Sequence, residues 1–223
     1  MSFIEYPDRE VMQLDLANKI AGELRSALDH QDRVSFCVSG GSTPGPVFDT
    51  LSDVSLDWGR VDVLLNDERW VPESSERSNT AMLKRRLLVN KAAHARLIPL
   101  YADVPTPEDG LAGLMPAIEA ILPINVLLLG MGDDMHTASL FPGADQLGLA
   151  LSDEAPTLLA MRAPGAAEPR ITLSANALKT AISTHILITG EGKRKAYEAA
   201  RDLPAQDAPV SVFLPQAHVH WAP

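Results

Sequence analysis

The sequence has very little cysteine and lacks any cluster of positive charge. Cys37 is the only cysteine among 223 residues, which excludes a disulfide framework, and its apolar neighbours favour a buried structural thiol over a nucleophile. The formal net charge is −10, and no block of lysine or arginine offsets it, so we expect no nucleic-acid partner. A few local cations are still sufficient to make a pocket for an anionic ligand.

Long apolar runs are missing as well. No stretch approaches the roughly 18 residues needed to span a bilayer. Residues 1–7 lack a basic region followed by an apolar one, so we expect no signal peptide, no membrane partner and a cytoplasmic location. The length, with 46% hydrophobic and 22% charged residues, predicts a single domain over residues 1–223.

Segments with a helical period alternate with short apolar segments typical of buried strands. The pattern predicts helices over residues 8–30, 44–51, 78–89, 108–122, 174–181 and 192–201, and strands over 33–38, 61–65, 97–100, 124–129, 157–161, 171–173 and 185–189. Residues 210–214 fit either a strand or a short helix. This alternation predicts an α/β fold with a mostly parallel sheet and helices on both faces. Ligands of such sheets bind beyond the carboxyl ends of the strands.

The first of two glycine-containing turns follows the strand predicted over residues 33–38. It contains Gly40, Gly41, Ser42 and Thr43 and leads into a helix. Two hydroxyls beside two glycines at a helix start offer several hydrogen-bond donors at one point, which favours a phosphate site. The alternative is a tight turn that binds nothing.

The second turn, residues 130–137, follows the most apolar of the predicted strands and carries Asp133, Asp134 and His136. An imidazole beside a carboxylate is what a general base requires. These three residues also have the chemistry of metal ligands, but a metal site usually draws on more convergent groups, so we expect no metal.

Further polar residues follow other strands. Asp67, Glu68 and Arg69 come directly after the strand predicted over residues 61–65, and they form either a solvated charged loop or part of a site. Arg170 and Lys193, taken singly, are typical of surface charges.

Five motifs, in order along the chain, together resemble the 6-phosphogluconolactonase family. They are residues 39–44 (SGGSTP), 66–72 (NDERWVP) with 78–79, 130–143, 170–173 and 190–193, and the most specific part is HTASLFPG at 136–143. The resemblance implies the fold of glucosamine-6-phosphate deaminase, a three-layer α/β sandwich around a mostly parallel, Rossmann-like sheet. It also implies hydrolysis of 6-phospho-D-glucono-1,5-lactone to 6-phospho-D-gluconate in the oxidative pentose phosphate pathway, without a cofactor.

The resemblance implies roles for the residues of these motifs. His136 is expected to take a proton from the attacking water, with Asp134 or Asp67 orienting the imidazole. The substrate phosphate is expected to be clamped by the first turn together with Lys193, Arg170 and Arg69. The expected partner is this small sugar-phosphate lactone alone, and the expected state is a monomer or weak homodimer.

Two other functions stay open at this point. One is a deaminase-like isomerase, although that sister family carries an acidic residue where this chain has Phe141. The other is a sugar-phosphate-binding regulator without catalysis.

Met135 departs from the family pattern, which usually has glycine at that place. A left-handed backbone at a residue with a side chain costs roughly 1–2 kcal/mol. We therefore expect a right-handed or extended backbone at Met135.

Overall fold

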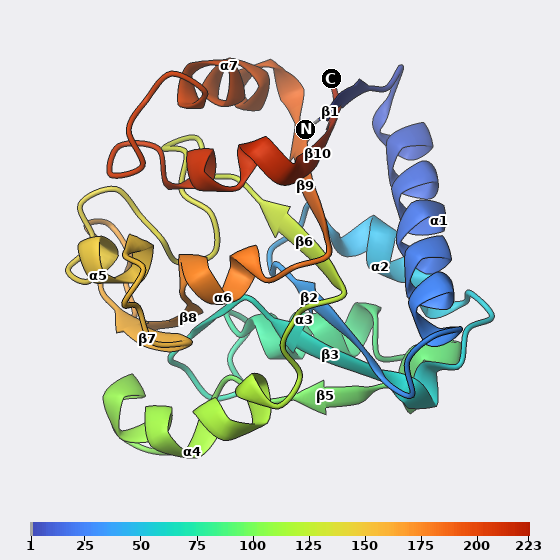
Figure 1. The fold of residues 1–223 in the computed structure, drawn as a ribbon, viewed down its shortest axis with the longest axis horizontal. Coiled ribbons are helices and arrows are strands. Elements are labelled where there is room, and N and C mark those ends of the chain that lie inside the picture. Colours follow the sequence, from blue (N-terminus) through green and yellow to red (C-terminus); the bar gives the residue numbers. More distant parts are fainter. Residues whose placement is uncertain (1) are drawn as a thin grey trace.

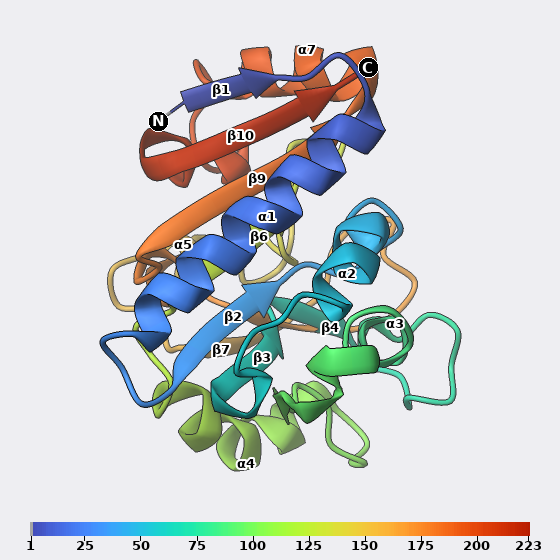
Figure 2. The same ribbon diagram turned by 90° about the vertical axis from the view of Figure 1, so that its right-hand side faces the viewer.

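The computed structural model describes residues 2–223, and its central element is a seven-stranded sheet (Figures 1 and 2). All neighbouring strands run parallel. Their order across the sheet is β1 (Ser2–Glu5), β10 (Ala217–Ala222), β9 (Ser183–Thr189), β6 (Val126–Gly130), β2 (Val34–Val38), β3 (Val61–Leu65) and β5 (Arg96–Ile98). The predicted α/β class with a mostly parallel sheet is confirmed.

Seven helices accompany the strands within the described residues. They are α1 (Arg9–Leu28), α2 (Gly45–Ser52), α3 (Asn79–Arg86), α4 (Pro107–Glu119), α5 (Leu147–Leu151), α6 (Ala175–Lys179) and α7 (Gly190–Ala200). Figure 1 shows α1 and α2 on one face of the sheet and α6 on the other. Residues 210–214, for which the sequence fitted either a strand or a short helix, begin within the 3₁₀ helix Pro209–Val212. No helix between residues 2 and 223 has the length and apolarity to cross a membrane.

The longest helix illustrates how local sequence and packing agree. Met12, Leu16, Ile20 and Leu24 recur at the helical period on one face of α1, and all four are fully buried. Asp8 caps the helix by accepting a hydrogen bond from Val11 N at 2.8 Å. The apolar face therefore fixes α1 on the sheet while the cap fixes where it begins.

A second, antiparallel sheet was not predicted. It consists of β4 (Asp67–Arg69), β8 (Arg170–Leu173) and β7 (Leu158–Met161). The Asp67–Arg69 segment is therefore a largely buried strand and not a solvated charged loop. Its charged sequence gave no strand signal, because pairing with β8 is decided by residues about 100 positions away.

The order of strands reverses between β2 and β6. From β2 the chain continues outward through β3 and β5, and it then returns to place β6 on the other side of β2, followed outward by β9 and β10. Ligand sites of such sheets lie beyond the carboxyl ends of the strands at this reversal. Both glycine-containing turns leave the sheet here, one after β2 and one after β6.

A chain of hydrogen-bonded side chains joins α1 to β9 and β10, away from these turns. Tyr6 donates to Asp15 at 2.5 Å, and its oxygen lies 2.9 Å from Nδ1 of His220. Nε2 of His220 lies 3.0 Å from Nδ1 of His185, whose Nε2 lies 2.9 Å from Glu23. Burial, reinforced by the electrostatic influence of the neighbouring His185, lowers the pKa of His220 to about 3.

His220 should make the protein lose stability on acidification. An unfolded histidine binds a proton near pH 6.5, whereas folded His220 does so only near pH 3, so its contribution is complete above pH 6.5 and is lost as the pH falls. A difference of one bound proton between the unfolded and folded states changes the free energy of unfolding by about 1.4 kcal/mol per pH unit. Chemical unfolding of His220→Gln between pH 6.5 and 4.5 should therefore show a shallower pH dependence than the wild type.

The exposed His30 supplies the control, because His30→Gln makes the same substitution at a histidine whose side chain lies in solvent. Its pH dependence should follow the wild type. If the free energy of unfolding fell equally with pH in His220→Gln and in the wild type, the proton taken up on unfolding would not belong to His220.

Candidate active site

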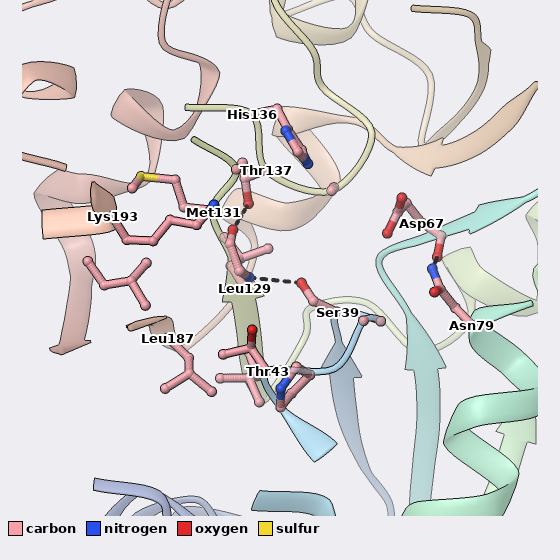
Figure 3. Close-up of a pocket in the computed structure, with 18 of the residues that line it drawn as sticks. Ser39, Thr43, Asp67, Asn79, Leu129, Met131, His136, Thr137, Leu187 and Lys193 are labelled. Carbon is pink, nitrogen blue, oxygen red and sulfur yellow. Dashed lines mark hydrogen bonds between the residues drawn. The ribbon is translucent and has the colours of Figure 1, made fainter. Parts of the chain in front are cut away.

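A cavity of about 270 Å³ lies beyond the carboxyl ends of β2, β3, β6 and β9 (Figure 3). It brings together most of the residues singled out in the sequence. Those that line it are Gly40, Gly41, Thr43, Asp67, Arg69, His136, Arg170 and Lys193. Ser42 is exposed and does not line the cavity, and Asp134 reaches it only through His136.

The first turn forms one wall of the cavity and presents backbone donors. Gly41 has a φ of +89°, a conformation that favours glycine, and α2 begins shortly afterwards at Gly45. Within residues 2–223, the N–H groups of residues 40–43 donate no hydrogen bond to another protein group. At Gly40 a Cβ would lie only 2.1 Å from Asn79, so the close packing of this turn requires glycine there.

The second turn holds His136 against Asp134. Nδ1 of His136 lies 2.5 Å from Oδ1 of Asp134. A Cβ on Gly132 would lie 2.1 Å from that Nδ1 and 2.3 Å from that Oδ1, so the absence of a side chain at Gly132 makes room for the pair. The Phe141 ring packs on the imidazole with a centroid distance of 4.1 Å.

The charge state of Asp134 determines the tautomer of His136. Burial opposes ionisation of Asp134, but the hydrogen bonds from the side chain and the backbone N–H of His136 outweigh it and hold the pKa of the carboxyl below its usual value. An ionised carboxylate only accepts hydrogen bonds, so the proton lies on Nδ1 of His136. Nε2 is then left with a free lone pair, as a general base requires.

Asp67 does not contact the imidazole. It accepts a hydrogen bond from Ser139 Oγ at 2.5 Å, and its Oδ2 lies 3.7 Å from Nη1 of Arg170. Of the two carboxylates considered as partners of His136, the structure therefore places only Asp134 beside it. Asp67 instead lines the wall of the cavity that lies across from Lys193 (Figure 3).

Two arginines face each other on that wall. Arg69 on β4 and Arg170 on β8 are directly opposed in the antiparallel pair. Arg170 is only 8% exposed, and burial, together with the charge of Arg69, lowers its pKa despite Asp67 nearby. The Nε atoms of both arginines are buried without a hydrogen-bond partner among residues 2–223. Like charges opposed in this way are destabilising unless an anion joins them.

Lys193 lies across the cavity, near the start of α7 (Figure 3). Its Nζ is 3.3 Å from Oδ1 of Asp133, a carboxylate that is 84% exposed. So exposed an ion pair is weak, which leaves the ammonium group available to an anionic ligand.

Some residues of the site were missed in the sequence. Ser39 lines the cavity, and its Oγ accepts hydrogen bonds from Asn66 Nδ2 at 2.7 Å and from Gly130 N at 3.0 Å. Thr137 also lines it and donates to Gly130 O at 2.8 Å. Ser39 ends an apolar strand and gave no signal of its own.

Across residues 2–223, no three histidine, cysteine, aspartate or glutamate side chains are arranged to hold a metal ion.

The backbone at Met135 contradicts the expectation drawn from the sequence. Its φ is 64°, in the left-handed region, so the prediction of a right-handed or extended backbone is wrong. Two hydrogen bonds hold this conformation, one from Met135 N to Gly132 O at 3.1 Å and one from Val210 N to Met135 O at 3.1 Å. The Met135 side chain also packs on the core, which offsets part of the backbone cost.

Comparison with known proteins gives a consistent result. A family model described as glucosamine-6-phosphate isomerases/6-phosphogluconolactonase matches residues 7–221. A 6-phosphogluconolactonase of Pseudomonas aeruginosa is 41% identical over 214 residues, covering 93% of this chain and 89% of the relative, and one of Mesorhizobium japonicum is 38% identical, covering 98% and 94%. The crystal structure of a 6-phosphogluconolactonase from Shewanella baltica matches with a TM-score of 0.93 at 33% identity, covering 100% of this chain and 98% of that one.

The strain at Met135 should be measurable by comparing two substitutions that remove the same side chain. Met135→Gly should be more stable than Met135→Ala by about 1 kcal/mol, because only alanine keeps a Cβ in the left-handed conformation. Urea unfolding of both variants gives the difference.

The same pair of substitutions at Met115 provides the control. Met115 lies inside α4, where the backbone is helical, so Met115→Gly should be less stable than Met115→Ala by about 1 kcal/mol. A glycine variant at position 135 that is less stable than its alanine counterpart would contradict the strain.

Proposed function

Because the chain belongs to the family of glucosamine-6-phosphate isomerases and 6-phosphogluconolactonases, we propose that it hydrolyses 6-phospho-D-glucono-1,5-lactone to 6-phospho-D-gluconate. This is a step of the oxidative pentose phosphate pathway. The observation that carries the proposal is the His136–Asp134 pair at one side of a cavity whose other sides present cations and free backbone donors. A cytoplasmic location and a monomer or weak homodimer, as expected from the sequence, are part of this proposal.

The proposed reaction begins with attack of water on the C1 carbonyl of the lactone. Nε2 of His136 takes a proton from the water as the water oxygen bonds to C1, and the π electrons of the carbonyl move to the carbonyl oxygen. The tetrahedral intermediate then collapses, the bond from C1 to the ring oxygen breaks, and the imidazolium returns the proton to that oxygen. Asp134 stabilises the imidazolium between the two steps, because it stays ionised and bonded to Nδ1.

The phosphate of the substrate is proposed to bind between the cations and the first turn. Arg69 and Arg170 face each other with buried, unpartnered Nε atoms among the described residues, an arrangement that a dianion would stabilise. Lys193 and the amides of residues 40–43 add further donors. Binding of this remote group orients the lactone at His136 and so contributes to the rate.

Phe141 favours lactone hydrolysis over deaminase-like isomerisation. Its apolar ring packs on His136 at the place where the sister family carries an acid, so a proton-transfer group for amine chemistry is missing at this position. A regulator without catalysis would need the cations but not the His136–Asp134 pair. Lactone hydrolysis, measured above the spontaneous rate and in parallel with deamination of glucosamine-6-phosphate, separates the three functions.

His136→Ala should lower kcat about 10²–10⁴-fold, the usual contribution of a general base, and leave the affinity for 6-phospho-D-gluconate nearly unchanged. Wild-type activity should also fall on acidification, because a protonated imidazole accepts no further proton. Asp134→Asn should lower kcat by a smaller factor, since the amide still accepts a hydrogen bond but carries no charge.

The exposed residues His30 and Asp153 provide matched controls, and His30→Ala and Asp153→Asn should have wild-type kcat. Near-normal kcat in His136→Ala would remove this histidine as the base.

Lys193→Ala and Arg170→Ala should mainly raise KM, because each loses a charge-assisted contact worth roughly 1.5–3 kcal/mol. Added salt should raise KM further in both variants. Lys195 is exposed on the same helix as Lys193, so Lys195→Ala is the matched control and should keep the wild-type KM. Steady-state kinetics that show unchanged KM in both test variants would place the phosphate elsewhere.

A further inference from the structure

Glu68 is the one residue of β4 that does not line the cavity. Side chains of a strand alternate between its two faces, so Asp67 and Arg69 point to the cavity and Glu68 points away from it. Glu68 is fully buried. A carboxylate in such a place is costly unless several donors satisfy it.

Four hydrogen-bond donors surround this carboxylate. Oε1 accepts from Arg69 N at 2.7 Å and from Asn79 N at 2.8 Å. Oε2 accepts from Thr80 N at 2.7 Å and from Ser78 Oγ at 3.2 Å. The positive end of the α3 dipole lies at the same point and favours the negative charge. Glu68 thus joins strand β4 to the first turn of helix α3.

Helix α3 has its own N-cap, so capping does not explain Glu68. The hydroxyl of Ser78 accepts from Ala81 N at 3.1 Å, as an N-cap residue does. The bonds from Asn79 and Thr80 to Glu68 instead fix where the helix lies relative to β4. Both elements contribute to the cavity, Asp67 and Arg69 from the strand and Asn79 from the helix.

The side chain of Asn79 connects helix α3 to the first turn. It packs so closely on Gly40 that a Cβ there would lie 2.1 Å from it, and its Nδ2 donates to Asp67 O at 3.3 Å. A shift of α3 would therefore move the wall against which the turn of residues 40–43 rests. The same shift would move the Arg69 backbone, whose N–H is bonded to Glu68.

We propose that Glu68 is a positioning residue that sets the spacing between the first turn, Arg69 and Asn79, and thereby the affinity of the cavity for the substrate phosphate. The proposal rests on the proposed function. Glu68 does not itself line the cavity and acts through the helix and strand that it joins.

Glu68→Gln tests this role with a side chain of the same shape. Its amide NH₂ cannot accept hydrogen bonds, so one pair of donors loses its acceptor. KM and the dissociation constant of 6-phospho-D-gluconate, measured by calorimetry, should both rise about 10-fold, while kcat stays within about threefold of the wild type. Glu73→Gln is the matched control and should change neither constant, because Glu73 is exposed and, among residues 2–223, forms an ion pair with Lys84 alone, at 2.7 Å.

Asn79→Ala provides a second test that keeps the backbone bond to Glu68. It should raise the same two constants, and the double variant should raise them by less than the product of the single effects. If Glu68→Gln does not fold, the single variant Asn79→Ala tests the proposal. Unchanged affinity in the folded variants, or a fall in kcat with unchanged KM, would overturn the proposal. Calorimetry needs no turnover, so a wild type that fails to hydrolyse the lactone would count against the proposed function alone.

Discussion

The parallel pairing of β2 with β6 is the constraint on which the site depends. The two strands meet where the strand order reverses, and their carboxyl ends are tied by Ser39, whose N–H donates to Leu128 O at 2.9 Å and whose Oγ accepts from Gly130 N at 3.0 Å. The turn that presents free amides therefore begins beside the turn that presents His136. Neither turn could form the cavity alone, since one supplies free backbone donors and the other supplies His136.

The second sheet adds charge that the main sheet could not hold. Antiparallel pairing of β4 with β8 opposes Arg69 to Arg170, and alternation along β4 sends Asp67 to the cavity and Glu68 to the interior. Two opposed guanidinium groups cost electrostatic free energy, which Asp67 offsets only in part at 3.7 Å from Arg170. Under the function proposed above, stability is exchanged here for affinity toward an anion, a common feature of functional sites.

The sequence predicted those parts of the molecule that depend on local pattern. The strand over residues 61–65 and the start of the helix predicted from residue 78 are confirmed, because burial and capping leave marks within a few residues. The strands β1, β10 and β4 were missed, since each is defined by a partner far along the chain: β1 pairs with β10, and β4 with β8. In the site, the motifs indicated His136 and Asp134 together, but the separation of Asp67 from the imidazole, and the place of Ser39, follow from the assembled sheets.

The turn that carries His136 requires glycine at position 132 but accepts methionine at position 135. Met135 and Ala138 both have left-handed backbones, with φ of 64° and 50°, and hydrogen bonds from Gly132 N to His136 O and from Val210 N to Met135 O hold the chain there. At position 135 a side chain costs only backbone strain, which the surrounding bonds and core packing can bear. At position 132 a Cβ would enter the space of the His136–Asp134 pair itself. A side chain is therefore tolerated at position 135, where the penalty is conformational, and it is excluded at position 132, where it would displace the His136–Asp134 pair.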